Sequence, residues 1–339
     1  MKEGLQKLYP KYKSRQVRLA IPSKGRMEIE TQDFLRSCGF NIQRNNRQYI
    51  GSIQEPINLQ LVYQRQVDIV RGVLNGSLEM GIVGYDLVLE YSPLNENELV
   101  IMHNALNFGK CSLEIAIPED WSEESIEKIR KNRKSLRVAT KFTKLTKDFL
   151  NSLDIEYELI KGNGSLEVYP ELGYSDIIVD LVSTGQTLKG NRLKRIIGGK
   201  IMTSEAVLIG NQTALKNEIV LKVARQLIEF IEATLRAQNF VSVFVNMRGE
   251  SPEEIANNIF SKEGLEGLQG PTISPVFTKS REKMYAIHII VEKQKLQQAI
   301  RSLREIGGSG VVVAPTLYIF EEEPLRYIKL LKNLGIYDD

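Results

Sequence analysis

The chain has 339 residues, 42% of them hydrophobic and 26% charged, and a formal net charge of +3. Its length exceeds the usual size of one hydrophobic core, so two or three domains of an ordinary folded protein are expected. The charge is too small to favour nucleic-acid or membrane partners. The sequence lacks the apolar core of a secretion signal and any run of about 18 apolar residues, which predicts a cytoplasmic location.

Cysteine and histidine are scarce in this sequence. Cys38 and Cys111 are the only cysteines, and His103 and His288 are the only histidines. Two cysteines are too few for a disulfide framework or a thiolate metal site, and two histidines nearly exclude a histidine-based metal site. A Ser-His-Asp triad would have to use one of these two histidines.

The first predicted strand is 17–22, followed by the turn Ser23-Lys24-Gly25-Arg26 and a helix that ends at Gly39. Lys24 and Arg26 flank a glycine at this strand-to-helix turn, where two cations can meet a phosphate at the helix N-terminus. Two solvated basic residues in a turn would give the same pattern, so the residues alone leave both interpretations open.

The segment 64–86 continues the alternation of strands and helices. It contains a helix closed by Asn75-Gly76, then strand 79–83 and the turn Gly84-Tyr85-Asp86. Glycines at the carboxyl ends of strands point to an open α/β sheet whose ligands bind along that edge. Tyr85 is a candidate for stacking on a base, although a tyrosine beside a turn is more often simply packed.

A second α/β unit follows strand 112–117. Its predicted elements are strand 136–139, helix 146–153, strand 157–160 and a glycine-rich turn over 162–167. Strand 206–209 returns to the first unit. Crossing over twice would produce two lobes with a cleft between them.

The stretch 176–188 carries the strongest chemical signal. Ile177-Ile178-Val179 suits a buried strand that ends at Asp180, and a polar loop with three hydroxyls and one glycine follows it, Ser183 to Thr187. Backbone N–H groups in such a turn, with a helix beginning near Leu188, can hold phosphate oxygens, and the carboxylate can hold ribose hydroxyls or help retain Mg²⁺. A plain surface loop remains the alternative.

The last part of the chain begins with the clearest helix, 214–238, which we interpret as a connector. The order of elements from 240 to 314 is then β-α-β-β-α-β, the ferredoxin-like arrangement of a small domain. Its turns 270–275 and 307–310 are the segments that would meet a ligand, although ordinary turn chemistry also explains them.

Several motifs in this order resemble the ATP phosphoribosyltransferase family, in its long form with a histidine-sensing C-terminal domain. The resemblance is carried by IPSKGR, RQVDIV, GSLEMGIVGYD and NGSLEVYPELGYSDIIVDLVSTGQTL, and in the plant-type branch by NMRG, GLQGPTISPVF and GGSGVVVAPTLYIFEE. It implies an α/β fold with a two-lobed, periplasmic-binding-protein-like core and a ferredoxin-like (ACT-like) regulatory domain. The implied boundaries are 1–110 for lobe I with return segment 200–213, 111–199 for lobe II, 214–238 for the connector and 239–339 for the regulatory domain.

The resemblance also implies a pentosyltransferase reaction, in which N1 of ATP attacks C1′ of phosphoribosyl pyrophosphate (PRPP) and pyrophosphate leaves. This first step of histidine biosynthesis needs no Ser, Cys or His nucleophile, because Mg²⁺ on the substrate phosphates makes pyrophosphate a good leaving group. The implied catalytic residues are Asp180, Glu167, Lys24 and Arg26. The implied PRPP site comprises Asp176, Asp180, Ser183, Thr184, Gly185, Gln186 and Thr187, and the implied ATP site comprises Arg65, Gly84, Tyr85 and Asp86.

For regulation, the resemblance implies a homo-hexamer inhibited by L-histidine. The histidine site would comprise Asn246, Leu268, Gly270, Thr272 and Gly310. The sequence departs from the family pattern at Val70, where proline is frequent, and at Gln186, where threonine or alanine is common. A two-lobed small-molecule binding protein and an inactive regulatory paralogue remain the alternative functions.

Overall fold

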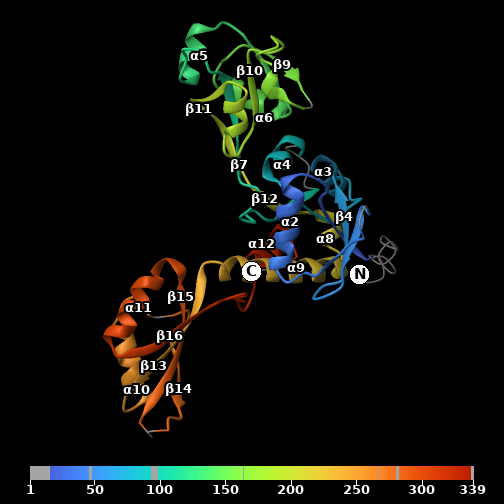
Figure 1. The fold of residues 1–339 in the computed structure, drawn as a ribbon. Coiled ribbons are helices and arrows are strands. Elements are labelled where there is room, and N and C mark those ends of the chain that lie inside the picture. The colour runs from blue at the N-terminus through green and yellow to red at the C-terminus, as the bar shows by residue number, and fades with distance from the viewer. Residues whose placement is uncertain are drawn as a thin grey trace. The chain divides into compact units, whose positions relative to one another are not determined.

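The computed structural model describes residues 16–45, 48–92, 98–162, 164–265, 267–279 and 282–336 (Figure 1). The chain forms two compact units, one comprising residues up to Ile228 together with the segment from Leu325, the other comprising Glu229–Pro324. Each unit has its own core, and none of the described helices is long and apolar enough to cross a membrane.

Lobe I of the first unit is built on a seven-stranded sheet in the order β2-β3-β4-β1-β5-β12-β6. Strands β4, β1 and β5 run parallel, whereas β12 is antiparallel to both of its neighbours. The strands are β1 (Val17–Pro22), β2 (Ile42–Gln43), β3 (Ile50–Ile53), β4 (Leu59–Gln64), β5 (Met80–Gly84), β6 (Leu99–His103) and β12 (Ala206–Asn211). The helices of this lobe are α2 (Arg26–Ser37), α3 (Gln66–Leu74), α4 (Tyr85–Tyr91) and α8 (Gln212–Leu215).

Lobe II contains a five-stranded sheet in the order β11-β7-β10-β8-β9, in which β10, β8 and β9 are parallel. Alternate residues of β10 enter different cores, Ile177 and Val179 on one face and Ile178 and Val182 on the other. Its elements are β7 (Cys111–Pro118), α5 (Ile126–Asn132), β8 (Leu136–Thr140), α6 (Thr143–Ser152), β9 (Tyr157–Lys161), η2 (Leu166–Val168), β10 (Ile177–Val182), α7 (Gln186–Gly190) and β11 (Leu193–Ser204).

The chain passes between the lobes twice, from β6 to β7 and from β11 to β12. This is the predicted two-lobed, periplasmic-binding-protein-like core, and that prediction is confirmed. The second crossing comes later than the expected return at residue 200, because β11 stays paired with β7 until Ser204 lies opposite Cys111. Only Glu205 separates β11 from β12.

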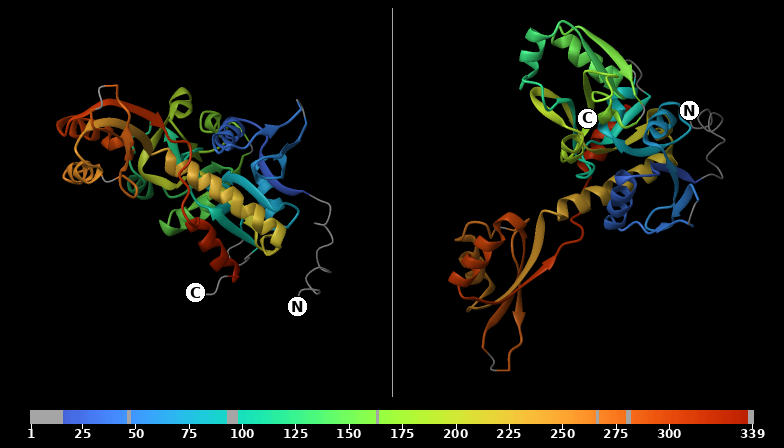
Figure 2. Two further views of the ribbon diagram at one scale, coloured as in Figure 1. Left: turned by 90° about the horizontal axis from the view of Figure 1, so that it is seen from below. Right: turned by 45° about the horizontal axis from the view of Figure 1, so that its top comes forward.

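The second unit contains a four-stranded antiparallel sheet in the order β14-β15-β13-β16, the predicted ferredoxin-like topology. Helices α10 and α11 lie on one face of the sheet (Figure 2), where Ile255, Ile259, Ala299 and Leu303 complete the core. Its elements are β13 (Phe240–Arg248), α10 (Pro252–Phe260), β14 (Thr272–Val276), β15 (Met284–Glu292), η3 (Lys293–Lys295), α11 (Leu296–Glu305) and β16 (Gly308–Pro315).

Two helices differ from the expected domain boundaries. Helix α9 (Glu218–Ala237) is the predicted connector, and the division between the units falls inside it. Helix α12 (Leu325–Leu334) belongs to the first unit, although the sequence interpretation assigned 239–339 to the C-terminal domain. It buries Tyr327, Leu330 and Leu334 and contacts β6, since its apolar stripe needs a partner surface.

Candidate functional site

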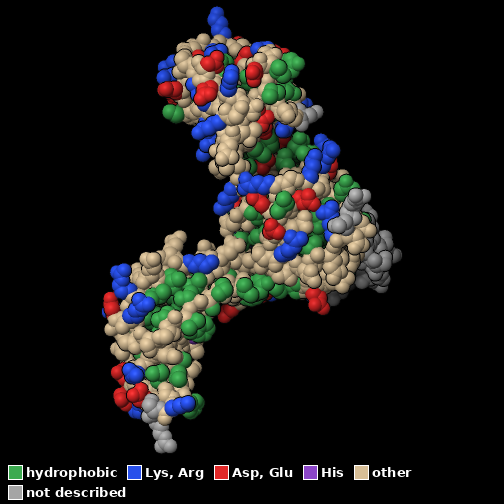
Figure 3. Space-filling model, viewed as in Figure 1, with side chains coloured by type: hydrophobic (Ala, Val, Ile, Leu, Met, Phe, Trp, Pro, Cys, Tyr) green, Lys and Arg blue, Asp and Glu red, His purple; other side chains and the backbone are tan. Residues whose placement is uncertain are grey.

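The carboxyl ends of parallel strands from both lobes meet at a cavity of about 730 Å³. This is the edge of α/β sheets at which ligands usually bind. The residues that line it come from the ends of β1, β4, β8 and β9 and from α3 and α4: Pro22, Ser23, Lys24, Gln64, Arg65, Gln66, Val67, Asp68, Arg71, Leu87, Tyr91, Lys141, Phe142 and Lys161. Figure 3 shows the hollow between the lobes, with Lys and Arg side chains on both sides of it.

Five cations and one carboxylate line this cavity. Within the described ranges, the side chains of Lys24, Arg65 and Lys161 make no ion pair or hydrogen bond. The guanidinium of Arg71 makes a cation–π contact, 5.5 Å from the ring centre of Tyr91. Unneutralised positive charges gathered in a hollow repel each other and attract anions. The cavity is therefore suited to a ligand with several negative charges.

Other basic residues near these strands are already paired. Arg26, a predicted catalytic residue, donates from Nε to Oε1 of Glu30 at 2.7 Å within α2 and does not line the cavity. Arg18 forms a buried ion pair with Glu79 at 2.7 Å. The structure thus brings Lys24 and Arg65 to the cavity but leaves Arg26 on the exposed side of its helix turn.

Asp180 lies on β10 beside the lobe II cations. Its Oδ2 is 3.8 Å from Nζ of Lys141, its Oδ1 accepts a hydrogen bond from the Leu181 N–H at 2.8 Å, and its side chain is 16% exposed. Burial raises the pKa of Asp180, the ammonium of Lys141 acts against this rise, and the charge of Glu167 adds to it. Strand β10 continues to Val182, so Asp180 does not end the strand as expected.

Glu167 and Asp176 were both expected near the same pocket, and the structure separates them. Glu167 lies in η2, close enough for its charge to act on Asp180. Asp176 precedes β10, about 20 Å along the strand from the loop that follows it. It pairs with Arg137 at 2.8 Å, and although burial acts to raise its pKa, the hydrogen bonds from Arg137 hold that pKa below the ordinary value.

The predicted anion loop Ser183–Thr187 follows the carboxyl end of β10. Gly185 has φ +77° and precedes α7, which begins at Gln186, two residues before the expected start. The Thr184 hydroxyl accepts a hydrogen bond from the Gln186 N–H at 3.4 Å. The N–H groups of Ser183, Thr184 and Gly185 donate to no acceptor among the described residues, so they remain available to an anion.

The turn after β5 was expected to contact ATP, but its three residues have different surroundings. The Gly84 N–H donates to Gln66 at 2.9 Å, and Tyr85 packs against the lobe I core. Asp86 is buried and accepts a hydrogen bond from Ser204 at 2.5 Å, and burial raises its pKa although this hydrogen bond lowers it. Of the four residues proposed for ATP, only Arg65 lines the cavity.

The residues expected to bind histidine lie in the second unit. Thr272 is the register partner of His288, which is the partner of Phe244, so Asn246 two residues later shares this sheet face with Thr272. Gly310 has φ +62°, and a Cβ added there would be 3.9 Å from Nδ2 of Asn246. Leu268 and Gly270 lie in the turn before β14.

Neither histidine lines the cavity. His103 is buried at the end of β6, where burial and the charge of Arg326 lower its pKa to about 3. Nε2 of His288, on β15, lies 2.7 Å from the hydroxyl of Ser242, on β13. In the described part of the chain, His, Cys, Asp and Glu also form no group of three that could hold a metal ion.

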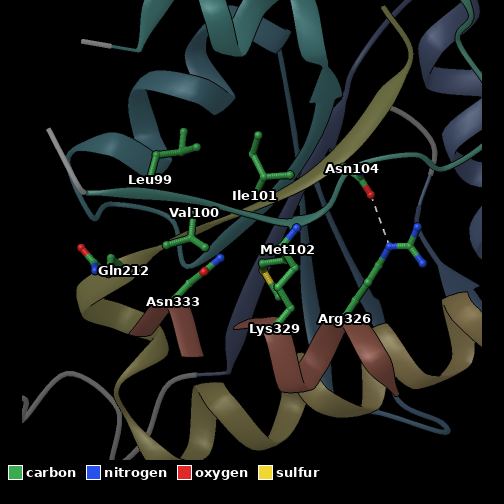
Figure 4. Close-up of a pocket in the computed structure, with 9 residues that line it drawn as sticks. All are labelled: Leu99, Val100, Ile101, Met102, Asn104, Gln212, Arg326, Lys329 and Asn333. Atoms are coloured by element: carbon green, nitrogen blue, oxygen red, sulfur yellow. Dashed lines mark hydrogen bonds between the residues drawn. The ribbon is translucent and has the colours of Figure 1, made fainter. Parts of the chain in front are cut away.

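A second cavity, of about 530 Å³, lies between β6 and α12 (Figure 4). It carries the cations Arg326 and Lys329, and Arg326 Nε donates to Asn104 at 3.3 Å. None of the residues proposed from the sequence lines it. The larger cavity between the lobes is therefore the candidate site.

Sequence reasoning missed three of the cavity's cations, Arg71, Lys141 and Lys161. Lys141 directly follows β8 and Lys161 is the last residue of β9. Both strands had been predicted, so a cation at the carboxyl end of a parallel strand was the available signal. Arg71 lies within α3 and had no such signal.

Comparisons with known proteins find similar sequences over most of the chain. A family model described as ATP phosphoribosyltransferase matches residues 65–234, and one described as HisG, C-terminal domain, matches residues 237–316. ATP phosphoribosyltransferase 2, chloroplastic, of Arabidopsis thaliana is 42% identical over 336 residues, covering 95% of this chain and 81% of that protein. ATP phosphoribosyltransferase of Methanocaldococcus jannaschii is 31% identical over 299 residues, covering 88% of this chain and 98% of that protein.

A solved structure shares the fold. It is the ATP phosphoribosyl transferase (HisG:HisZ) complex from Thermotoga maritima, with a TM-score of 0.52 and 24% identity. The match covers 64% of this chain and 98% of that chain. At this identity the likeness concerns the fold alone.

Proposed function

Since this chain belongs to the ATP phosphoribosyltransferase family, we propose that the cavity between its lobes is where the reaction of that family takes place. The enzyme transfers the 5-phosphoribosyl group of PRPP to N1 of ATP and releases pyrophosphate, the first step of histidine biosynthesis. The observation that carries the assignment of the site is the group of unneutralised cations at strand ends of both lobes, since both substrates are polyanions.

We assign one substrate to the cavity and the other to the loop that follows β10. This loop and Asp180 do not line the cavity, but Asp180 lies 3.8 Å from Lys141, which does. In this assignment the Ser183–Thr187 loop holds the 5′-phosphate of PRPP through its free N–H groups, and Asp180 accepts hydrogen bonds from the ribose hydroxyls. Lys24 and Arg65 of lobe I hold the phosphates of ATP, and Lys141 and Lys161 neutralise the pyrophosphate. Catalysis then rests on orienting N1 toward C1′, which is worth roughly 7–11 kcal/mol.

Mg²⁺ fits this arrangement as a companion of the substrates. The cation prefers oxygen ligands and is commonly bound through substrate phosphates plus one or two carboxylates. Asp180 and Glu167, whose charges act on each other, are the carboxylates that would hold it. When bound, Mg²⁺ would neutralise the leaving pyrophosphate.

Incubation of the protein with ATP, PRPP and Mg²⁺ tests the function directly. Phosphoribosyl-ATP and pyrophosphate should form in equal amounts. A binding protein or an inactive paralogue would form neither product above a control without enzyme, under conditions where a known member of the family turns over.

The conformation of Gly185 supports a prediction about the PRPP loop. At φ +77° an alanine costs about 1–2 kcal/mol, because its Cβ strains the left-handed backbone although no atom lies closer than 3.9 Å. Gly185→Ala should therefore raise KM for PRPP about tenfold. Steady-state kinetics with varied PRPP would measure this.

Gly190→Ala is the matched control, since Gly190 ends the same short helix with open space around it and no positive φ. It should leave KM for PRPP unchanged. An equal effect of the two substitutions would contradict the role of the loop.

We further propose that the second unit senses L-histidine and supports a homo-hexamer. Asn246 and Thr272 share a sheet face with Phe244 and Val312, which are register partners and are 44% and 58% exposed. Polar groups beside an exposed apolar face suit a small polar ligand next to a contact between subunits. Sedimentation in solution tests the hexamer.

L-histidine at 100 times its Kd should raise the free energy of unfolding of its site by about 2.7 kcal/mol. The rise would appear as a higher melting temperature in a thermal-shift measurement. Asn246→Ala should abolish the shift, whereas Asn257→Ala, an exposed position on α10, should retain it. A shift that survives in Asn246→Ala would count against this site.

A further inference from the structure

Helix α4 of lobe I is joined to lobe II at both of its ends. At its start, the Asp86 N–H donates to the Ser204 hydroxyl at 3.0 Å, and this hydroxyl donates to the Asp86 carboxylate at 2.5 Å. Ser204 is the last residue of β11, next to the second crossing between the lobes. The end of α4 approaches a different element of lobe II, the helix α6.

Glu90 makes the contact with α6. Its Oε1 accepts hydrogen bonds from the Lys144 N–H at 2.9 Å and the Thr143 hydroxyl at 3.2 Å, and its Oε2 accepts one from the Leu145 N–H at 3.0 Å. These are groups of the first turn of α6, whose own N-cap residue, Phe142, provides no side-chain hydrogen bond. A residue of lobe I thus caps a helix of lobe II.

A second set of bonds runs in the opposite direction. Nζ of Lys144 donates to the Leu89 carbonyl at 2.8 Å and to the Ser92 carbonyl at 3.5 Å, at the C-terminal end of α4. The N-terminus of α6 is thus next to the negative charge of Glu90, and the C-terminus of α4 is next to the positive charge of Lys144. Both placements favour the unpaired backbone groups of these helix ends. Leu87 packs against the cores of both lobes beside these bonds. We call this group of contacts the α4–α6 clasp.

The α4–α6 clasp is directly behind the proposed reaction cavity. Leu87 and Tyr91 of α4 line that cavity, and so do Lys141 and Phe142, the residues just before α6. Glu90 itself is 8% exposed and does not line the cavity. Its carboxylate connects α4 of lobe I to the first turn of α6 in lobe II.

From these contacts we propose that Glu90 is a positioning residue of the transferase: by capping α6 across the lobes, it fixes the distance between the lobe I cations and Lys141 of lobe II, beside which Asp180 lies. This rests on the proposed placement of ATP and PRPP on opposite lobes. Each substrate still meets its own lobe when the clasp is broken, but N1 and C1′ are no longer held in line. The clasp therefore acts on kcat more than on KM.

Kinetics of Glu90→Ala and Glu90→Gln test the proposal. Glu90→Ala should lower kcat roughly 10- to 100-fold, with KM for each substrate changed less than about threefold. Glu90→Gln retains one acceptor and should fall between this variant and the wild type, and it also serves if Glu90→Ala does not fold. Rates are expressed per folded molecule.

Glu123→Gln is the matched control. Glu123 is a lobe II carboxylate, 5% exposed and paired with Arg133 at 3.2 Å, which does not line the cavity. It should lose stability and retain kcat. An unchanged kcat in Glu90→Ala, a loss confined to KM, or an equal loss of kcat in Glu123→Gln would each overturn the proposal.

Hydrogen exchange tests the α4–α6 clasp independently of the proposed function. The amides of Lys144 and Leu145 should exchange faster in Glu90→Ala than in the wild type, since both lose their acceptor. Unchanged exchange at these two amides would overturn the clasp by itself. A wild-type protein that forms no phosphoribosyl-ATP would instead overturn the proposed function, whatever the exchange shows.

Discussion

Replacing Asp180 by asparagine is expected to lower kcat/KM for PRPP roughly 10²- to 10³-fold, the loss typical of one preorganised electrostatic contact in an active site. The carboxylate is 16% exposed beside Lys141, so it can accept hydrogen bonds from ribose hydroxyls and stabilise positive charge on the sugar as pyrophosphate leaves. Steady-state kinetics with varied PRPP measure this. Asp148→Asn, on the exposed side of α6, should leave kcat/KM unchanged.

The same carboxylate should set the acidic limb of the pH profile, because only its ionised form carries the negative charge that stabilises the sugar as pyrophosphate leaves. Burial raises the pKa of Asp180, so kcat/KM should fall as pH falls through a value above the ordinary range. Lys141 lowers that pKa, and Lys141→Met should therefore move the fall toward neutral pH. A limb at the same pH in wild type and Lys141→Met would contradict the assignment.

Replacing Arg65 by methionine is expected to raise KM for ATP about 10- to 100-fold, the cost of one hydrogen bond to a charged group. Arg65 follows β4, lines the cavity and has no hydrogen bond or ion pair with any described side chain, so its charge is free for a phosphate. Since the substitution also removes repulsion among the cavity cations, the free energy of unfolding should change by less than about 0.5 kcal/mol.

Arg36→Met is the control for Arg65→Met, because Arg36 is exposed on α2 and pairs with Asp33 outside the cavity. Its KM for ATP should equal that of the wild type. Raising the ionic strength should weaken ATP binding to the wild type more than to Arg65→Met. Equal salt dependence in the two proteins would show that Arg65 does not face the phosphates.

Many helices and strands of this protein could be predicted from the sequence, because the hydrophobic patterns that indicate them involve residues close together in the chain. The buried run before Asp180, the helix of 214–238 and the β-α-β-β-α-β order each appear in the structure at nearly the predicted residues. Short strands with weaker patterns, such as β2, β3 and β6, were not predicted. Helix α12 was also missed, since its apolar stripe is buried only by contact with β6, which is far away in the sequence.

The composition of the site needed the tertiary structure. Asp176 and Asp180 are four residues apart, and the family resemblance implied that they share one site. The direction of β10 instead puts Asp176 near the opposite end of the strand, where it pairs with Arg137. Asp86 was expected to face ATP, and instead it is buried against Ser204. Strand direction and burial are properties of the packed sheet, so local spacing does not reveal them.

By itself the sequence determined the two-lobed α/β class, the family and the loop that follows β10, because hydrophobic periodicity and motif order depend on residues that are close together in the sequence. Only the tertiary structure decided which cations share one cavity and that Glu90 caps a helix 53 residues away. Contacts at such separations depend on which strands pair and how the lobes pack. Both are decided when the apolar side chains of the two lobes are buried together in their cores.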